Sequence, residues 1–146
     1  MKKIGDYTIR GSINDGTIQK IQLFDGKFST AYKVVEFVVF PQDALASASD
    51  VAGVLMTENT GVPSPLWQAD LNTQIAWSSV WVAGTAASVA PFTIIDPDNL
   101  IVEDLYIHIN NTSSDESNYF IRMEKYDITE YQGALAMVRN NAQNVE

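Results

Sequence analysis

Most of this chain consists of short runs in which apolar and polar residues alternate, each closed by a turn signal. Alternation with a period of two is typical of a strand with one face in a core and one in solvent. The strand-like runs lie at residues 7–13, 17–24, 33–40, 51–57, 73–82, 92–95, 100–110 and 119–128. This pattern predicts a mainly β fold, as an antiparallel sandwich, a jelly roll or a barrel-like domain. A length of 146 residues fits a single domain, 1–146.

Glycine-containing turns follow the first two runs, as Asn14-Asp15-Gly16 and Asp25-Gly26. These residue types tolerate positive φ, so each turn predicts a hairpin in which the two flanking strands pair. Residues 33–40 are nearly all apolar, which predicts a strand buried on both faces. Gly53 lies inside a later run and predicts a bulge or bend there.

One short helix is predicted near the C-terminus, at residues 129–140. Thr129 and Gln132 fit a capping box, in which each side chain satisfies a free backbone N–H of the first turn. Tyr131, Leu135 and Val138 follow at helical spacing and form an apolar stripe. We expect the polar tail, residues 141–146, to fray.

Charge is distributed unevenly along the chain. Eighteen acidic and nine basic residues give a formal net charge of −9. Residues 1–40 carry six of the basic residues, whereas residues 41–120 carry ten acidic residues and no Lys or Arg. An acidic surface favours solubility, and it can also meet the basic end of a neighbouring copy in head-to-tail association. The expected interaction residues are Lys2, Lys3, Arg10 and Arg139.

Composition argues against several functional classes. An acidic chain is unsuited to direct nucleic-acid binding, because phosphates require basic partners. The absence of cysteine excludes disulfides, cysteine-ligated zinc, iron–sulfur clusters and thiol nucleophiles. The single histidine excludes a polyhistidine metal site within one chain. No apolar run approaches the roughly 18 residues of a membrane-spanning helix, so no membrane partner is expected.

The densest carboxylate group is Asp96, Asp98 and Asp104. Calcium takes several oxygen ligands, which turns supply together with backbone carbonyls, so these three residues are candidate calcium ligands. Their spacing does not match an EF-hand loop, and the alternative interpretation is a capped turn in solvent. No other cofactor site is indicated.

Trp67, Trp77 and Trp81 are the aromatic candidates for a binding surface. Exposed tryptophans on a sheet can stack against sugar rings. Trp77 and Trp81 share one face of the run 73–82, and two large aromatics on a half-buried strand are expected to point into the core. Trp67 is therefore the aromatic residue included among the expected interaction residues.

His108 is the one obvious acid–base candidate. On a strand it shares a face with Asp104 and Tyr106, and a histidine near a carboxylate can act as a general base. No nucleophile motif, paired catalytic carboxylates or dinucleotide fingerprint accompanies it. We therefore expect that the protein is not an enzyme.

Two stretches in the second half of the chain carry a resemblance to a family. They are IDPDNLIVEDLYI at residues 95–107, and MEKYDI at 123–128 followed by GALAMVRN at 133–140. They are similar to small uncharacterised virion structural proteins of marine bacteriophages. Residues 11–40 of this chain resemble the N-terminal part of those proteins more loosely. The resemblance carries no catalytic motif, so no functional residue transfers from it.

The resemblance implies a virion component that assembles in many copies to form or stabilise a capsid. Capsid decoration or cement protein and small shell protein are the roles that fit the chain's length. Partners would be copies of the same chain and other virion proteins, and a homo-oligomer is expected. The alternative is a carbohydrate- or receptor-binding β-module, such as a tail-fibre part, and a third hypothesis is a small β enzyme that depends on His108.

Overall fold

The computed structural model describes residues 2–24, 26, 29–43, 49–59, 67–82 and 91–128, and its regular elements there are eight β-strands. They are β1 (Lys2–Ile13), β2 (Thr17–Ile21), β3 (Thr30–Pro41), β4 (Ser49–Met56), β5 (Gln74–Val82), β6 (Phe92–Ile95), β7 (Leu105–Asn111) and β8 (Ser117–Asp127). Each strand overlaps one predicted run, and this confirms the mainly β fold. The predicted helix 129–140, the tail 141–146 and Arg139 lie outside the described residues.

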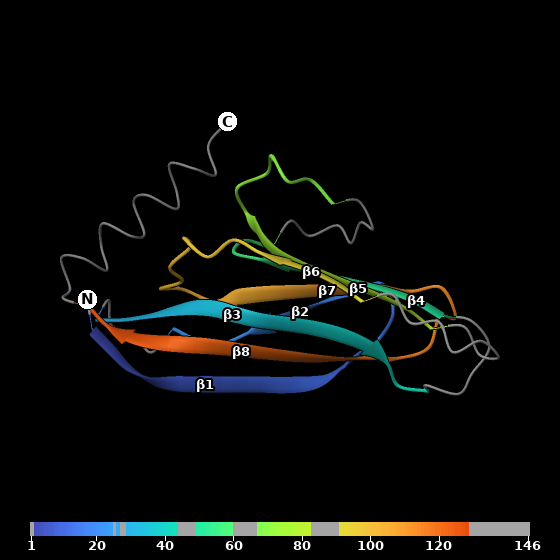
Figure 1. Ribbon diagram of the computed structural model, residues 1–146, viewed down its shortest axis with the longest axis horizontal. Coiled ribbons are helices and arrows are strands. Elements are labelled where there is room, and N and C mark those ends of the chain that lie inside the picture. The colour runs from blue at the N-terminus through green and yellow to red at the C-terminus, as the bar shows by residue number, and fades with distance from the viewer. Residues whose placement is uncertain are drawn as a thin grey trace.

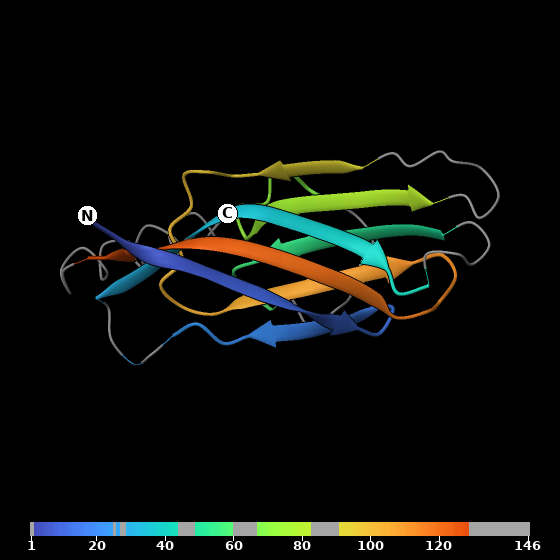
Figure 2. The ribbon, with the colours of Figure 1, turned by 60° about the horizontal axis from the view of Figure 1, so that its bottom comes forward.

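The strands form two antiparallel sheets that pack face to face as a β sandwich (Figure 1). One sheet has the order β1-β8-β3, and the other has the order β2-β7-β4-β5-β6. Figure 2 shows the three-stranded sheet lying across the face of the five-stranded one. The core between them consists of buried apolar side chains from both sheets, among them Phe37, Leu55, Ile107, Ile109, Ile121 and Met123.

The two predicted hairpins are absent, although glycine has positive φ in both turn sequences. Gly16 has φ 71° and Gly26 has φ 87°. However, β1 pairs with β8 and β2 pairs with β7, so the turn at Asn14 carries the chain from one sheet to the other. Likewise β2 and β3 belong to different sheets. The turn residues specify a local change of direction, and the long-range partners β7 and β8 decide the pairing.

Strand β3 is buried on one face only, so the prediction that both faces are buried is wrong. Phe37 and Val39 face the other sheet and are buried, whereas Val38 and Phe40 are exposed. The alternation is offset by a register shift between Val34 and Glu36. An apolar run indicates burial on both faces only where a second layer covers the outer face, and no described strand lies over the outer face of β3.

Gly53 marks a close approach of the two sheets, not the predicted bulge. The ladders of β4 run without a shift through Gly53 to both β5 and β7. A Cβ on Gly53 would lie 2.7 Å from Val39 Cγ1 and 3.2 Å from both Phe37 Cζ and Ile109 Cγ1. The missing side chain therefore makes room for core residues of β3 and β7.

Candidate functional site

The candidate calcium ligands are divided between the two edges of the five-stranded sheet. Asp96 follows β6 at one edge, where its carboxylate accepts hydrogen bonds from Asp98 N and Asn99 Nδ2, both at 3.1 Å. Asp104 precedes β7 near the opposite edge, beside β2. Within the described ranges, no group of three His, Asp or Glu side chains is placed to hold a metal ion. Asp96 therefore caps a turn, and Asp104 belongs to a separate network.

Asp104 anchors the segment that follows β2. Its Oδ1 accepts hydrogen bonds from Leu23 N at 2.9 Å and Phe24 N at 3.1 Å, and its Oδ2 lies 3.2 Å from Lys20 Nζ. Burial would raise the pKa of Asp104, but the two backbone N–H groups and the Lys20 ammonium outweigh it and hold the pKa below its usual value. The ionised carboxylate is thus part of the folded structure.

Asp104→Asn should lower the free energy of unfolding at pH 7 by about 1–2 kcal/mol, because the ion pair with Lys20 is lost and so is the negative charge that strengthens the hydrogen bonds from Leu23 N and Phe24 N. Since the folded-state pKa of Asp104 lies below its unfolded value of about 3.9, its stabilisation is present above that pH and is lost as pH falls through the folded-state pKa. The difference between wild type and variant should therefore shrink in acid. Denaturant unfolding at a series of pH values measures it. Asp98→Asn, which changes an exposed carboxylate, is the control and should have little effect; an equal loss there would contradict the assigned role of Asp104.

His108 lies on β7 and is 2% exposed. Its Nε2 is 3.5 Å from Asn110 Nδ2. Asp104, one of the two side chains expected to share its face, is engaged by Lys20 and by the backbone after β2. The structure thus places the imidazole out of contact with solvent.

The two tryptophans of β5 do not face the core, so that prediction is wrong. Leu55 of β4 is opposite Ala76, and the next residue, Met56, is opposite Gln74, so β5 has one extra residue here. A bulge of this kind changes which side chains of the strand face the core beyond it. Ala76 is buried, while Trp77 is half-buried and Trp81 is 42% exposed on the outer face.

The outer face of β5 and β6 contains an apolar groove of about 190 Å³, which we call the aromatic groove. Its lining residues are Trp67, Ala69, Trp77, Phe92 and Ile94. Trp67 stacks on Phe92, with ring centroids 6.1 Å apart and planes inclined by 17°. Trp67 was expected at a surface site. Phe92 and Ile94 were missed, because a four-residue strand does not indicate which face is covered.

Gln74 holds the segment that carries Trp67 against β5. Its Oε1 accepts hydrogen bonds from Trp77 Nε1 and from Gln68 N, both at 2.9 Å. The indole N–H of Trp77 is thereby satisfied within the protein, and the groove presents an apolar surface. Phe92 and Ile94 are 45% and 50% exposed. Contiguous exposed apolar side chains of this kind mark surfaces for protein contact or ring stacking.

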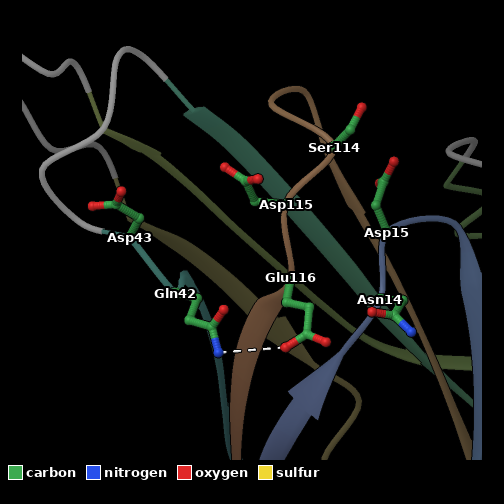
Figure 3. Close-up of a pocket in the computed structure, with 7 residues that line it drawn as sticks. All are labelled: Asn14, Asp15, Gln42, Asp43, Ser114, Asp115 and Glu116. Atoms are coloured by element: carbon green, nitrogen blue, oxygen red, sulfur yellow. Dashed lines mark hydrogen bonds between the residues drawn. The ribbon is translucent and has the colours of Figure 1, made fainter.

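A second hollow, of about 750 Å³, lies where the β1–β2 turn, the end of β3 and the β7–β8 loop meet (Figure 3). Its lining residues are Asn14, Asp15, Gln42, Asp43, Ser114, Asp115 and Glu116. The carboxylates do not converge: Asp15 Oδ1 accepts from Asn111 N at 2.6 Å, and Glu116 Oε2 accepts from Gln42 Nε2 at 3.4 Å. The four carboxylates among the lining residues make the surface of this hollow negatively charged. Sequence reasoning missed it because three separate segments build it.

The basic residues at the start of the chain lie on β1. Lys3 Nζ is 2.9 Å from Glu124 Oε2 and 3.2 Å from Asp6 Oδ1, and these contacts raise the pKa of Lys3. Hydrogen bonds to the Glu124 carboxylate lower its pKa; the one from the Lys3 ammonium has the larger effect and the one from the Tyr126 hydroxyl the smaller. Lys2 and Arg10 are exposed. Lys3 is therefore neutralised within its own chain, while Arg10 forms no ion pair with any described residue.

No protein-family model, curated protein or solved structure matches this chain. Among the described residues, no helix has the length and apolar character needed to span a membrane. The features that bear on function are the sandwich and its exposed apolar surfaces, together with the resemblance carried by residues 95–107, 123–128 and 133–140.

Proposed function

We propose that this protein is a structural component of a phage virion, present in many copies that form or stabilise the capsid. The observation that carries the proposal is the pairing order: β1 with β8, β2 with β7 and β4 with β5. These are three of the four antiparallel pairs of an eight-stranded jelly roll, an architecture found in viral capsid domains and also in lectin domains. The fourth pair would be β3 with β6. Here β6 pairs with β5, although Thr93 Oγ1 of β6 donates to Phe37 O of β3 at 3.2 Å.

Exposed apolar side chains on both sheets support a role in assembly. Phe40 and Val38 lie on the outer face of β3, and the aromatic groove lies on β5 and β6. Such surfaces lose contact with water when copies or other virion proteins cover them. We infer a structural, non-catalytic role in the virion, with protein partners and no direct contact with nucleic acid, in keeping with the net charge of −9.

Immunogold electron microscopy of a phage concentrate that carries this sequence tests the proposal. An antibody against the purified chain should place many gold particles on each labelled virion, because a shell or decoration protein is present in many copies. Preimmune serum is the control. Signal confined to the soluble fraction, with unlabelled particles, would overturn the proposal.

The aromatic groove favours a second candidate, a carbohydrate- or receptor-binding module, because Phe92 is 45% exposed and Trp67 half-buried beside it, so a sugar could stack on the ring surface that remains. Under the virion proposal, we expect no glycan in a broad set to change the tryptophan fluorescence of the full chain. A saturable change that Trp67→Ala abolishes and Trp81→Ala retains would favour the second candidate. Trp81 is a matched control because it is exposed but does not line the groove.

A further inference from the structure

Strand β1 is an edge strand of the three-stranded sheet, and we call its outer side the open edge (Figure 2). Among the described strands, β8 is its one ladder partner. Nearly all of its residues are exposed or half-buried; Ile4 is 51% and Tyr7 43% exposed. Proteins usually protect such an edge with proline, charge, bulges or a covering segment. Here a register shift lies between Lys3 and Gly5, and the ladder is regular from Gly5 to Ile13.

The backbone groups of β1 alternate between β8 and the open edge. Their direction follows from β3, where Phe37 O accepts from Thr93 Oγ1 and so faces away from β8. Ile121 is opposite Phe37, so its N–H and C=O face β1, where they meet those of Ile9. The backbone N–H and C=O groups of Ile9 and of every second residue from it thus face β8. The residues between them point their N–H and C=O groups to the open edge, and these residues are Asp6, Thr8, Arg10 and Ser12.

This edge is complementary to itself in one antiparallel register, centred on Thr8. In that register, Asp6 lies opposite Arg10 of a second copy, and the two-fold axis repeats the pair. Tyr7 and Ile9 also lie opposite each other, and Thr8 meets Thr8. Pairs of opposite charge, of aromatic with β-branched residues and of two threonines are favourable cross-strand pairs. A contact built from one patch on both copies closes as a dimer.

Neighbouring registers that preserve the hydrogen bonds lack this match. A register centred on Asp6 or on Arg10 places like charges opposite each other. A register centred on Tyr7 or on Ile9 puts an uncharged residue opposite Arg10. Within its own chain, Arg10 has no ionic partner among the described residues. Asp6 remains exposed beside Lys3 and Arg122, at 3.2 and 3.8 Å.

We propose that two copies of this chain pair through β1, antiparallel and centred on Thr8, so that two three-stranded sheets become one six-stranded sheet. The occupant of the edge is a second copy because the charge pattern of residues 6–10 is self-complementary. This inference goes beyond the proposed function, since it rests on the β1 edge and its pairing in the three-stranded sheet and uses neither the aromatic groove nor the resemblance.

Analytical ultracentrifugation of the full chain over a wide concentration range tests the proposal. Wild type should form a concentration-dependent dimer. Arg10→Asp places two like-charge pairs in the interface and should raise the dissociation constant about tenfold or more, because like charges opposite each other are unfavourable. The double variant Asp6→Arg/Arg10→Asp restores opposite charges and should recover most of the affinity. Failure of the double variant to recover it, with the fold intact, would contradict the register.

Thr8→Pro tests the edge itself. The N–H of Thr8 faces the open edge, so proline there should leave the β1–β8 ladder and the thermal midpoint nearly unchanged while it abolishes the dimer. A monomer at every concentration would overturn the proposal, as would a dimer that neither Arg10→Asp nor Thr8→Pro weakens. A dimer lost in Phe92→Ser but retained in Thr8→Pro would place the interface at the aromatic groove instead, so this result also separates β1 pairing from assembly through the groove.

Discussion

Phe37→Ala should lower the free energy of unfolding by about 3–5 kcal/mol, the usual range for truncation of a buried phenylalanine. Phe37 is 0% exposed in the core between the sheets. Its Cζ lies 3.2 Å from the position that a Cβ on Gly53 would take, so the ring fills the space that Gly53 leaves open. Truncation removes this contact with β4 and leaves a cavity between the two sheets. Denaturant unfolding followed by tryptophan fluorescence measures the loss, with the slope m unchanged if the unfolded state is unaffected.

Phe40→Ala is the matched control for this experiment. Phe40 lies on the same strand but on the outer face, where it is 43% exposed. Its truncation should change the free energy of unfolding by no more than about 0.5 kcal/mol. Equal losses for the two variants would contradict the assignment of the inner and outer faces of β3.

Gly53→Ala should lower the free energy of unfolding by about 1–3 kcal/mol, as overpacking does in other cores. Elsewhere in a strand, the same change stabilises by roughly 0.5–1 kcal/mol, because alanine loses less backbone entropy on folding. The sign of the effect is therefore diagnostic. Here the new methyl group would lie 2.7 Å from Val39 Cγ1, so either the sheets separate or the side chain moves.

Gly5 and Val39 provide the controls for Gly53. A Cβ on Gly5 would meet nothing within 4 Å, so Gly5→Ala should be neutral or stabilising in the same unfolding assay. Val39→Ala removes the methyl group that collides, so Gly53→Ala should cost less in that background. Purely additive losses in the double variant would show that the collision with Val39 is not the cause.

The positions of the strands could be predicted from the sequence, but their partners could not. Alternation reports which side chains share a face, and together with the apolar run at residues 33–40 and the turn signals it located all eight strands of the described part. It contains no information on the neighbouring strand. The turn at Gly16 predicts a hairpin, although β1 and β2 pair with strands near the other end of the chain.

The prediction of which strand face is buried was wrong in two strands, in β5 because of a bulge and in β3 because its outer face is exposed. The bulge at Ile75 moved Trp77 and Trp81 to the outer face, and a bulge leaves no mark in an alternating pattern. The apolar sequence of β3 predicts burial on both faces, yet Val38 and Phe40 on its outer face are exposed. Asp104 was identified as a notable carboxylate, but its partners Lys20 and Leu23 are more than 80 residues away in the chain. Long-range neighbours of this kind are set by topology.

The position of β7 and β8 within the sheets sets the order in which the chain can fold. Each lies between two strands synthesised earlier, β7 between β2 and β4 and β8 between β1 and β3. On the ribosome, β1, β2 and β3 emerge long before their partners exist, whereas β4, β5 and β6 can pair as soon as they are made. Pairing of β8 with β1 and β3 closes long loops of chain. This step is slow, because the chain loses conformational entropy before the new contacts stabilise it. The edges of β1 and β3 therefore lack their ladder partner until β8 has left the exit tunnel, and unpaired strand edges of this kind are prone to aggregate.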